Sequence, residues 1–458
     1  MYIFYDFETS DKDFLGQILS YYFVLVDEDF NPLQDCGGLI KPNRMECPRG
    51  QALAVNRLSL QECLNHGQSE FEAANRIYQF IQGITNEYNK VPLVGFNSAR
   101  FDFKHYEKLL LKYGLSPTFY SNISSLDIYE YCKYLATTYP TTFPIPTTTK
   151  DSHTYTTFKL ESLANAFNCL DTPQTHDAKS DVLLTLSLTQ KLNQQFQPSL
   201  KAFYTQQANI HLQPHHTFTE PFIAYEYNAK SPIDQHEWLV LGSVSKQTVI
   251  LLNTASYNTL HIQSIADVQP CLKYLNTRTH FINHSQPIDA SNHPILNSPY
   301  IKTIQQNIHQ YFDLFPNDWD IEYRPWAMGF QCIEQLRNLI ESLIHDPNRY
   351  PSIIQTWQTN NQILPADQKI KHRHMITLFN RFYLNYHPNP NPTHIQKYIQ
   401  NRYINGHMFR NPSDFLSPQA DRLQTLKTLT NTTDVHLQQV LKEHEEYTQR
   451  FIQSYLSS

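Results

Sequence analysis

The sequence predicts an α/β protein whose first part is built on a mixed sheet. Three strand-like runs come first, strands and helices then alternate, and the pattern changes after about residue 195. Strands that alternate with helices are typical of an α/β domain. At 458 residues the chain is too long for one compact core, so two or three domains are expected.

The expected strands of the first domain are aromatic and β-branched runs. Residues 2–7 (YIFYDF) and 20–26 (SYYFVLV) have the composition of buried strands, and a third run ends near Lys41. Residues 92–96 (PLVGF) indicate a fourth strand. Three strands that lead into alternating strands and helices imply a mixed sheet.

Helices are expected between and after these strands. Residues 69–72 (SEFE) form a capping box that starts a helix, which Gly83 should end. A second helix follows Asn97, and two further helical patterns cover residues 159–168 and 177–193. The Thr- and Pro-rich stretch before them, at residues 138–157, should be a loop.

Beyond this first domain the pattern divides again. Short strand-like runs at residues 238–241 and 248–252 suggest a small β-rich domain. From about residue 330 the periodicity is helical, with a long stretch at residues 434–456. The expected domains therefore cover residues 1–195, 196–345 and 346–458.

Charge is distributed unevenly along the chain. The formal net charge of −6 does not indicate a nucleic-acid binder. Residues 1–195 hold 16 Lys and Arg against 22 Asp and Glu (16 − 22 = −6), and the remaining residues hold 20 of each. An acidic first domain suits a site that collects divalent cations, although solvated surface carboxylates explain most excesses of this kind.

The cysteine count and the apolar pattern limit the class of protein. The seven Cys residues form no CxxC pair, so a disulfide framework or a thiolate zinc site is not expected. The N-terminus, MYIFYDFETS, lacks the pattern of a signal peptide. No stretch approaches the roughly 20 apolar residues of a spanning helix. We therefore expect a soluble, cytoplasmic protein that does not associate with a membrane.

The first candidate site residues lie on the first strand. Asp6 and Glu8 alternate on it, so their side chains point to the same face and can reach one metal site. Burying two acids without a partner would be costly, which favours a bound cation. The alternative is that the strand ends at Phe7 and both acids are solvated.

Asp102 follows the fourth strand and opens a helix. An acid in this position lies at the carboxyl end of a strand, where open α/β sheets place their sites. The alternative is an acid that only interacts with the N-terminal dipole of its helix.

The segment His176-Asp177-Ala178-Lys179-Ser180-Asp181 supplies the remaining candidates. His176 and Asp181 would lie on different faces if both were helical. We therefore expect His176 in a loop, Asp177 at the N-cap, and Asp181 one turn inside the helix, facing the sheet. The alternatives are a simple capping role for Asp177, which we prefer, and a surface loop histidine at 176.

Taken in order, these residues resemble the DEDDh exonuclease superfamily. Its four carboxylates and its histidine correspond to Asp6, Glu8, Asp102, Asp181 and His176. The segments DFET, GFNSARFD, FKLESL and THDAKSDV look like those of the bacterial exonuclease I family. Recognisable motifs cover about the first 195 residues. Beyond them the resemblance rests on domain order and short pieces.

The resemblance implies a ribonuclease H-like exonuclease domain with a mixed sheet, an SH3-like β-containing domain and a C-terminal helical domain, which enclose a groove for single-stranded DNA. Carboxylates without thiolates suit two Mg²⁺ ions, for which Mn²⁺ can substitute. The four acids would hold the metals, Glu8 would also touch the substrate, and His176 would be the general base. The family further implies a monomer, with a single-strand-binding protein as a possible partner.

The sequence also departs from the family. The loop after Glu8 is shorter and lacks a Phe-Gly pair, and Lys159 stands where the family has a substrate-contacting arginine. A lysine can hold a phosphate as a point charge, without the bidentate fork of arginine. The segment 320–365 matches nothing in the family.

A binding signal lies between Gln368 and Ser413, where no acidic residue occurs. Cations interleave there with aromatic residues, as a single-strand groove requires. The alternative is a helical hairpin with core aromatics and solvated cations, and the two interpretations can coexist. The candidate substrate-binding residues are Glu8, Lys159, Lys369, Lys371, Arg373 and Arg381.

Two rival functions remain at this stage. One is a 3′→5′ exoribonuclease of the same superfamily, because no residue visible here reads a 2′-hydroxyl group. About 260 residues beyond the exonuclease domain argue against it, since such trimmers are usually single domains. The other is a catalytically silent nucleic-acid-binding relative, against which the intact acids and histidine argue.

Overall fold

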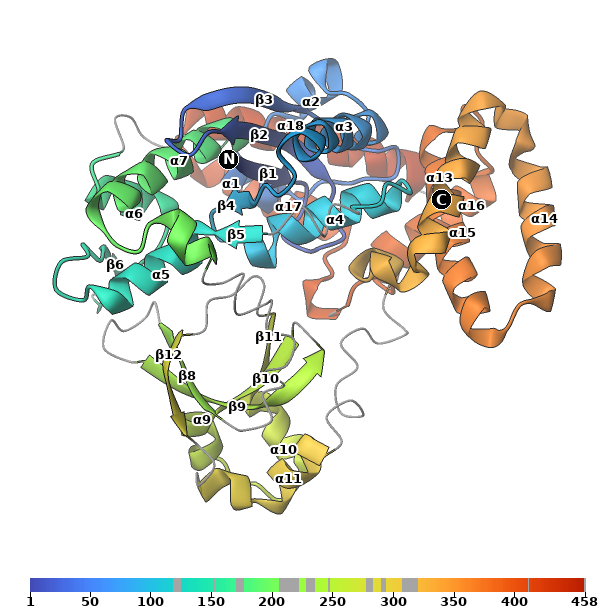
Figure 1. The fold of residues 1–458 in the computed structure, drawn as a ribbon. Helices are drawn as coiled ribbons and strands as arrows, with labels where there is room; N and C mark the ends of the chain where they lie inside the picture. The colour runs from blue at the N-terminus through green and yellow to red at the C-terminus, as the bar shows by residue number, and fades with distance from the viewer. Residues whose placement is uncertain are drawn as a thin grey trace.

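The computed structural model describes residues 1–117, 125–150, 153–169, 177–205, 222–227, 235–245, 248–276, 283–289, 294–306, 320–410 and 412–456. Its first part is an α/β unit, drawn blue to green in Figure 1. The strands of this unit are β1 (Tyr2–Thr9), β2 (Ile18–Val26), β3 (Pro32–Leu39), β4 (Leu93–Gly95) and β5 (Ser125–Asp127). Its helices are α1 (Gly50–Asn56), α2 (Leu60–His66), α3 (Glu70–Tyr88), α4 (Asp102–Lys112), α5 (Ile128–Thr138), α6 (Leu160–Ala166) and α7 (Ala178–Gln195).

The five strands form one mixed sheet in the order β3-β2-β1-β4-β5. β1 pairs antiparallel with β2, and β2 pairs antiparallel with β3. β4 lies parallel to β1, and β5 lies parallel to β4. The predicted mixed sheet is therefore confirmed.

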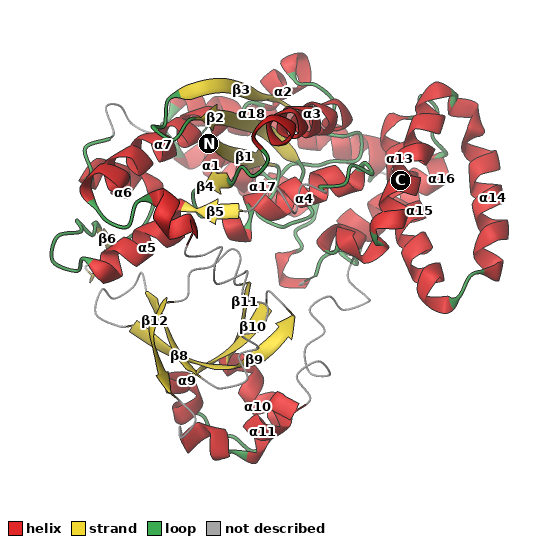
Figure 2. Cartoon of the chain, in the orientation of Figure 1, coloured by secondary structure: helices red, strands yellow, loops and turns green. Residues whose placement is uncertain are grey.

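Each face of this sheet carries its own core. Ile3, Tyr5 and Phe7 of β1 pack with α3 and α4, whereas Tyr2 and Phe4 pack with α5, α6 and α7. Figure 2 shows helices around the yellow strands of this sheet. Because side chains alternate along a strand, the even-numbered residues of β1 face α7. This alternation decides where the acids of β1 point.

Two local expectations were wrong. α3 does not end at Gly83 but continues to Tyr88, because Ile84 and Thr85 extend its buried face and Gly83 lies exposed in open space. The Thr-rich stretch expected as a loop contains a two-stranded hairpin of β6 (Thr147–Lys150) and β7 (His153–Thr156). Alternating β-branched threonines suit such strands.

The second unit is an antiparallel sheet of the order β11-β10-β9-β8-β12 with a small core of its own. Its predicted strands are confirmed as β9 and β10, which pair antiparallel. Figure 1 shows this unit below the first sheet, with α9 to α11 on its far side. Its elements are β8 (Phe222–Tyr227), β9 (Gln235–Ser245), β10 (Thr248–Asn253), α9 (Thr254–Thr259), α10 (Ile265–Val268), β11 (Leu272–Asn276), β12 (Asn283–Asp289) and α11 (Pro299–Gln306).

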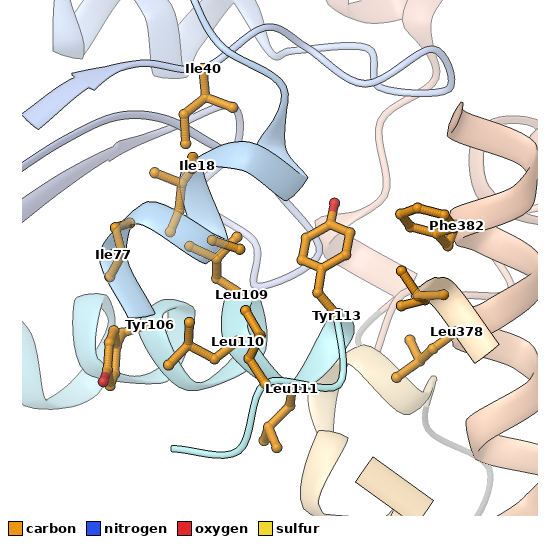
Figure 3. Close-up of a cluster of buried hydrophobic side chains, with 14 of the residues drawn as sticks. Ile18, Ile40, Ile77, Tyr106, Leu109, Leu110, Leu111, Tyr113, Leu378 and Phe382 are labelled. Atoms are coloured by element: carbon orange, nitrogen blue, oxygen red, sulfur yellow. The ribbon is translucent and has the colours of Figure 1, made fainter. Parts of the chain in front are cut away.

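The helical unit begins earlier than the residue 346 that we expected. Ile333, Leu336 and Ile340 share one core with Leu378 and with the α3–α4 face of the first sheet, so residues before 346 belong here. Figure 3 shows Leu378 and Phe382 beside Tyr113 in this core. The helices are α13 (Phe330–His345), α14 (Tyr350–Ile363), α15 (Ala366–Tyr386), α16 (Pro392–Ile399), a π-helical turn (Gln400–Ile404), α17 (Pro418–Asn431) and α18 (Val435–Tyr455).

The last two helices return to the first domain. α18 packs against α1 and α2, and Val440 shares a core with Leu19, Leu53 and Leu60. Asp434 caps α18 by accepting a hydrogen bond from the backbone N–H of Leu437, 3.1 Å away. The long C-terminal helix predicted from the sequence is therefore present. Within the described ranges, no helix is long and apolar enough to cross a membrane.

Candidate active site

Three of the predicted acids meet between β1 and α7. One carboxylate oxygen from each of Asp6, Glu8 and Asp181 lies within 4.8 Å of the others. Asp6 and Glu8 point to the face of the sheet that α7 covers, because they are even-numbered residues of β1. The alternative of two solvated acids at a strand end was wrong, since β1 continues to Thr9 and Glu8 is only 8% exposed.

The start of α7 places Asp181 as predicted. Asp177 is the N-cap, and its carboxylate accepts a hydrogen bond from the backbone N–H of Ser180, 3.0 Å away. Asp181 follows one turn later, and its N–H donates to the carbonyl of Asp177. The preferred capping role of Asp177 is therefore confirmed. His176 lies outside the described residues.

Asp102 is the first residue of α4 and is 7% exposed. The backbone of Phe7, between Asp6 and Glu8, forms a hydrogen bond with its carboxylate, which ties α4 to β1. The charge of Asp102 also raises the pKa of both Asp6 and Glu8. Asp102 therefore adjoins the cluster of Asp6, Glu8 and Asp181, although it lies outside the 4.8 Å group.

Burial and mutual repulsion perturb the pKa values of Asp6, Glu8 and Asp102. Burial, followed by the charges of Asp102, Glu8 and Asp181, raises the pKa of Asp6 well above its ordinary value. Burial, followed by the charges of Asp181 and Asp102, does the same to the pKa of Glu8. Burial raises the pKa of Asp102 to about 8. Without a cation, burial and repulsion therefore shift the equilibrium of these side chains toward the protonated form.

The donor set fits a hard divalent cation. Every candidate ligand is a carboxylate oxygen, which Mg²⁺ and Mn²⁺ prefer over thiolate ligands. In the described part of the chain, neither Asp6 nor Glu8 forms an ion pair with a lysine or an arginine. Largely buried acids that have no ion pair with a described lysine or arginine are the arrangement that a metal ion would neutralise.

The acid cluster leads to a prediction about stability. The pKa of Asp102 rises from 3.8 to about 8 on folding, so the folded metal-free protein holds more protons than the unfolded chain in this range. Its free energy of unfolding should therefore fall as the pH rises through this window. Urea denaturation in EDTA would show the slope, and Asp102→Asn should reduce it. A wild-type slope equal to that of Asp102→Asn would contradict the burial effect, and Mg²⁺ should restore stability at high pH.

Asp127, at the end of β5, is a residue whose role sequence reasoning missed. Its carboxylate accepts hydrogen bonds from the backbone N–H groups of Asn97 (2.7 Å), Ala99 (3.0 Å) and Tyr129 (2.9 Å). The bonds from Asn97 and Ala99 hold the turn before Asp102, in which Asn97 has a left-handed φ of 54°, and the bond from Tyr129 caps α5. Burial raises the pKa of Asp127 to about 7. The sequence signal that could have revealed this role is an acid at the end of a strand, at the carboxyl edge of the sheet.

The expected substrate-binding cations have different surroundings. Lys159 is exposed immediately before α6. On α15, Lys371 and Arg373 are exposed and Lys369 is partly buried. The structure corrects our prediction that Arg381 is one of these exposed substrate-binding cations.

Arg381 is 7% exposed, and its guanidinium pairs with Asp320 at 2.5 Å and with Glu322 at 2.6 Å. Because these ion pairs hold it inside the helical unit, it has a structural role here. The aromatic residues of the same window are also mainly core, since Phe379, Phe382, Tyr383, Tyr403 and Phe409 are buried. The window therefore combines a core hairpin with a few exposed cations.

Comparison with solved structures identifies the fold. Exonuclease I from Methylocaldum szegediense superimposes with a TM-score of 0.68 at 15% identity, over 98% of this chain and 99% of that chain. Exonuclease I of E. coli in complex with a dA16 oligonucleotide gives 0.69 at 18% identity, again over 98% and 99%. The zinc-bound form of the E. coli enzyme–single-stranded DNA complex gives 0.65 at 15% identity, over the same shares.

No protein-family model matches the sequence, and no curated protein matches it significantly. Identities of 15–18% establish the fold and not the activity. The combination of an α/β domain, a small β domain and a helical C-terminal unit agrees with the fold class that the sequence resemblance implies. Over 98% of its length, the chain has the fold of exonuclease I.

Proposed function

We propose that this chain is a 3′→5′ exonuclease that degrades single-stranded DNA to nucleoside 5′-monophosphates. The observation that carries the proposal is the cluster of Asp6, Glu8 and Asp181, with their oxygens within 4.8 Å, in a chain with the exonuclease I fold. Asp102, beside them at the start of α4, completes a set of four acids.

Asp6, Glu8, Asp102 and Asp181 would hold two divalent cations, Mg²⁺ or Mn²⁺. Bound there, such a pair supplies a nucleophile made from water and positive charge for the leaving 3′ oxygen. The chain itself supplies the rigidity that the reaction needs. β1 fixes two acids on a sheet strand, Asp127 fixes the turn before Asp102, and the Asp177 cap fixes the turn that carries Asp181.

His176 would be the general base that takes a proton from the attacking water. It directly precedes the N-cap of α7 in the sequence, five residues before Asp181. A neutral imidazole can accept this proton, whereas the neighbouring carboxylates would be occupied as metal ligands. Glu8 and Lys159 would also contact the terminal nucleotide.

Single-stranded DNA is the proposed substrate because similar structures contain it. The E. coli protein was solved with dA16 and with a 5cy-dA13 oligonucleotide. In this chain, Lys371 and Arg373 are exposed cations that can follow a phosphate backbone. A monomeric state, a cytoplasmic location and a single-strand-binding protein as partner are further parts of the proposal.

A degradation time course tests the function. It would compare 3′-labelled and 5′-labelled single-stranded DNA, duplex DNA and RNA, each with Mg²⁺ or with EDTA. We expect stepwise release of 5′-monophosphates from the 3′ end of single-stranded DNA only with the metal. Preferential degradation of RNA would point to an exoribonuclease instead. No metal-dependent turnover of any substrate would point to a catalytically silent relative.

The cations of α15 give a prediction about salt dependence. Replacing Lys369, Lys371 and Arg373 together by alanine should weaken binding of long single strands. It should also flatten the dependence of log K on log salt by roughly 0.7 for each phosphate that the protein no longer neutralises. Turnover of dinucleotides should hardly change, because they occupy only the acid site. Affinities for a long oligonucleotide at several salt concentrations measure both effects.

A matched variant controls for the change in net charge. It replaces three exposed cations of the α17–α18 hairpin by alanine, which are Lys427, Lys442 and Arg450. This variant should keep the wild-type slope. If both variants changed the slope equally, the effect would come from net charge, and α15 would not line the path of the strand.

A further inference from the structure

The segment 320–330 packs between α4 of the first domain and α15 of the helical unit. It contains two 3₁₀ turns, η5 (Ile321–Tyr323) and η6 (Pro325–Met328), and it ends where α13 begins at Phe330. η6 packs against both α4 and α15. Glu322 anchors the segment from inside through its ion pair with Arg381. The resemblance to the exonuclease I family assigns this segment no role.

Tyr323 connects this segment to the loop that follows Glu8. Its hydroxyl donates a hydrogen bond to Oδ1 of Asp13 at 2.6 Å, and its ring lies 5.9 Å from that of Phe14. Lys108 of α4 holds the same loop by donating to the carbonyl of Phe14 at 2.5 Å and to that of Gly16 at 2.6 Å. The segment is therefore fixed relative to the strand that carries Asp6 and Glu8.

Beyond Tyr323, the segment presents a pair of aromatic rings. Trp326 is partly buried against the large core, and the ring of Phe330 meets it edge to face, with centroids 5.7 Å apart. Phe330 itself is 61% exposed. Among the described apolar side chains that are more than half exposed, Phe330 is the aromatic one; Ile363 and Val435, for example, are aliphatic. A supported ring with a free face is a surface on which another flat ring can stack.

An exposed cation lies beside this pair. The side chain of Lys371 passes Gly329, with its Cδ 3.9 Å from the position that a Cβ of Gly329 would occupy. Arg373 is also exposed on α15. Glu334 is exposed one turn beyond Phe330, so the positive charge comes from α15 and not from α13. Aromatic faces flanked by cations are the combination that binds unpaired bases and their phosphates.

We propose that Trp326 and Phe330 form a base-stacking site for single-stranded DNA, with Lys371 at the neighbouring phosphate. The site would take an unpaired base of the substrate on the 5′ side of the bond that is cleaved. The Tyr323–Asp13 hydrogen bond would help to fix the distance between this base and the acid cluster. A base inside a duplex is stacked on its neighbours and cannot offer its face to Phe330. This inference rests on the proposed function and adds a selectivity element for single strands.

The test is the affinity for a long single-stranded oligonucleotide, with Asp181→Ala present in every protein so that the strand is not degraded. Phe330→Ala should bind roughly 5- to 150-fold more weakly, the range expected for the loss of one stacked base. Phe330→Tyr should keep the affinity, whereas Phe330→Leu should lose it, because leucine keeps apolar area without an aromatic face. Ile363→Ala, which removes a side chain of α14 that is 84% exposed, should bind like the parent.

A single abasic site moved along the oligonucleotide locates the contact. At one position it should weaken binding to the parent protein and leave binding to Phe330→Ala unchanged, because the two losses concern the same contact. The salt slope of Phe330→Ala should equal that of the parent, since the ring carries no charge. Equal affinities of Phe330→Leu and Phe330→Tyr would overturn the stacking site. So would an abasic site that, at every position, weakens binding to Phe330→Ala as much as it weakens binding to the parent protein.

The failure of this inference can be distinguished from the failure of the proposed function. If the wild-type protein degrades single-stranded DNA and Phe330→Ala binds it normally, only the stacking site is wrong, and a protein partner becomes the better occupant of the exposed ring. If the wild-type protein degrades no single-stranded DNA, the proposed function is wrong.

Discussion

Replacing either Asp6 or Asp181 by alanine should abolish turnover of single-stranded DNA. Each substitution removes one carboxylate from a cluster whose oxygens lie within 4.8 Å, and so removes a ligand from the proposed metal site. The variants should still fold, because deleting one of several mutually repelling acids relieves strain in the metal-free protein. Rates at saturating Mg²⁺ measure the first effect, and thermal unfolding with and without Mg²⁺ measures the second.

Mg²⁺ should raise the melting temperature of the wild type more than that of either variant, because an ion that binds only the folded state stabilises it by mass action. Asp35→Asn is the matched control. Asp35 is an exposed acid of the same sheet, on β3, whose carboxylate accepts a hydrogen bond from the hydroxyl of Tyr22 at 2.7 Å. It should keep wild-type turnover. Near-normal rates for Asp6→Ala or Asp181→Ala would show that the metal site has been assigned to the wrong residues.

Replacing His176 by alanine should lower the catalytic rate by about 10²- to 10⁴-fold, the usual range for the loss of a general base. Substrate affinity should stay almost unchanged, because the acids and the cations that bind the strand remain. The rate of the wild type should fall on the acid side, since a protonated imidazole cannot accept the proton of water. Single-turnover rates and binding constants, measured across pH at saturating Mg²⁺, separate these effects.

His66→Ala provides the control for His176. His66 is an exposed histidine at the end of α2, a helix that packs against α18 and β3, and its loss should leave the pH profile intact. A His176→Ala variant that loses affinity but keeps its rate would make His176 a binding residue. The general base would then have to be sought elsewhere around the acid cluster.

The acid cluster could be predicted because short-range geometry determines it. Alternation along β1 puts Asp6 and Glu8 on one face, and an N-cap at Asp177 puts Asp181 one turn into its helix. Both rules need only a few neighbouring residues. The order of the motifs then indicated that the separate pieces belong to one site, which no single piece could show.

The role of Arg381 could not be predicted in the same way. On the sequence it is a cation in an acid-free window, which suggests a DNA contact. Its partners Asp320 and Glu322 lie 61 and 59 residues earlier, in a segment without a recognisable motif. A buried ion pair depends on the packing of both partners, and helical periodicity contains no information about that packing.

Asp127 and Lys108 illustrate the same limit for single polar groups. Asp127 holds backbone N–H groups 28 and 30 residues before it, and Lys108 holds carbonyl groups 92 and 94 residues before it. Neither partner is a side chain, so no residue type marks it in the sequence. Such contacts appear only when remote segments of backbone have been placed in space.

The C-terminal hairpin has a consequence for the synthesis of this protein. The backbone N–H of Gly50 donates to Asp421, His444 forms a hydrogen bond with the carbonyl of Pro48, and Thr425 fills the space beside Gly50. These buried groups near the start of the chain have no such partners until the ribosome has added α17 and α18. The α/β domain is thus closed by helices that are translated 371 residues after Gly50, as the Gly50–Asp421 hydrogen bond shows. During translation, the region around Gly50 should therefore stay incompletely folded until α17 and α18 have been made. Chains that end before residue 418 should be recognised as misfolded and removed by the cell's quality control.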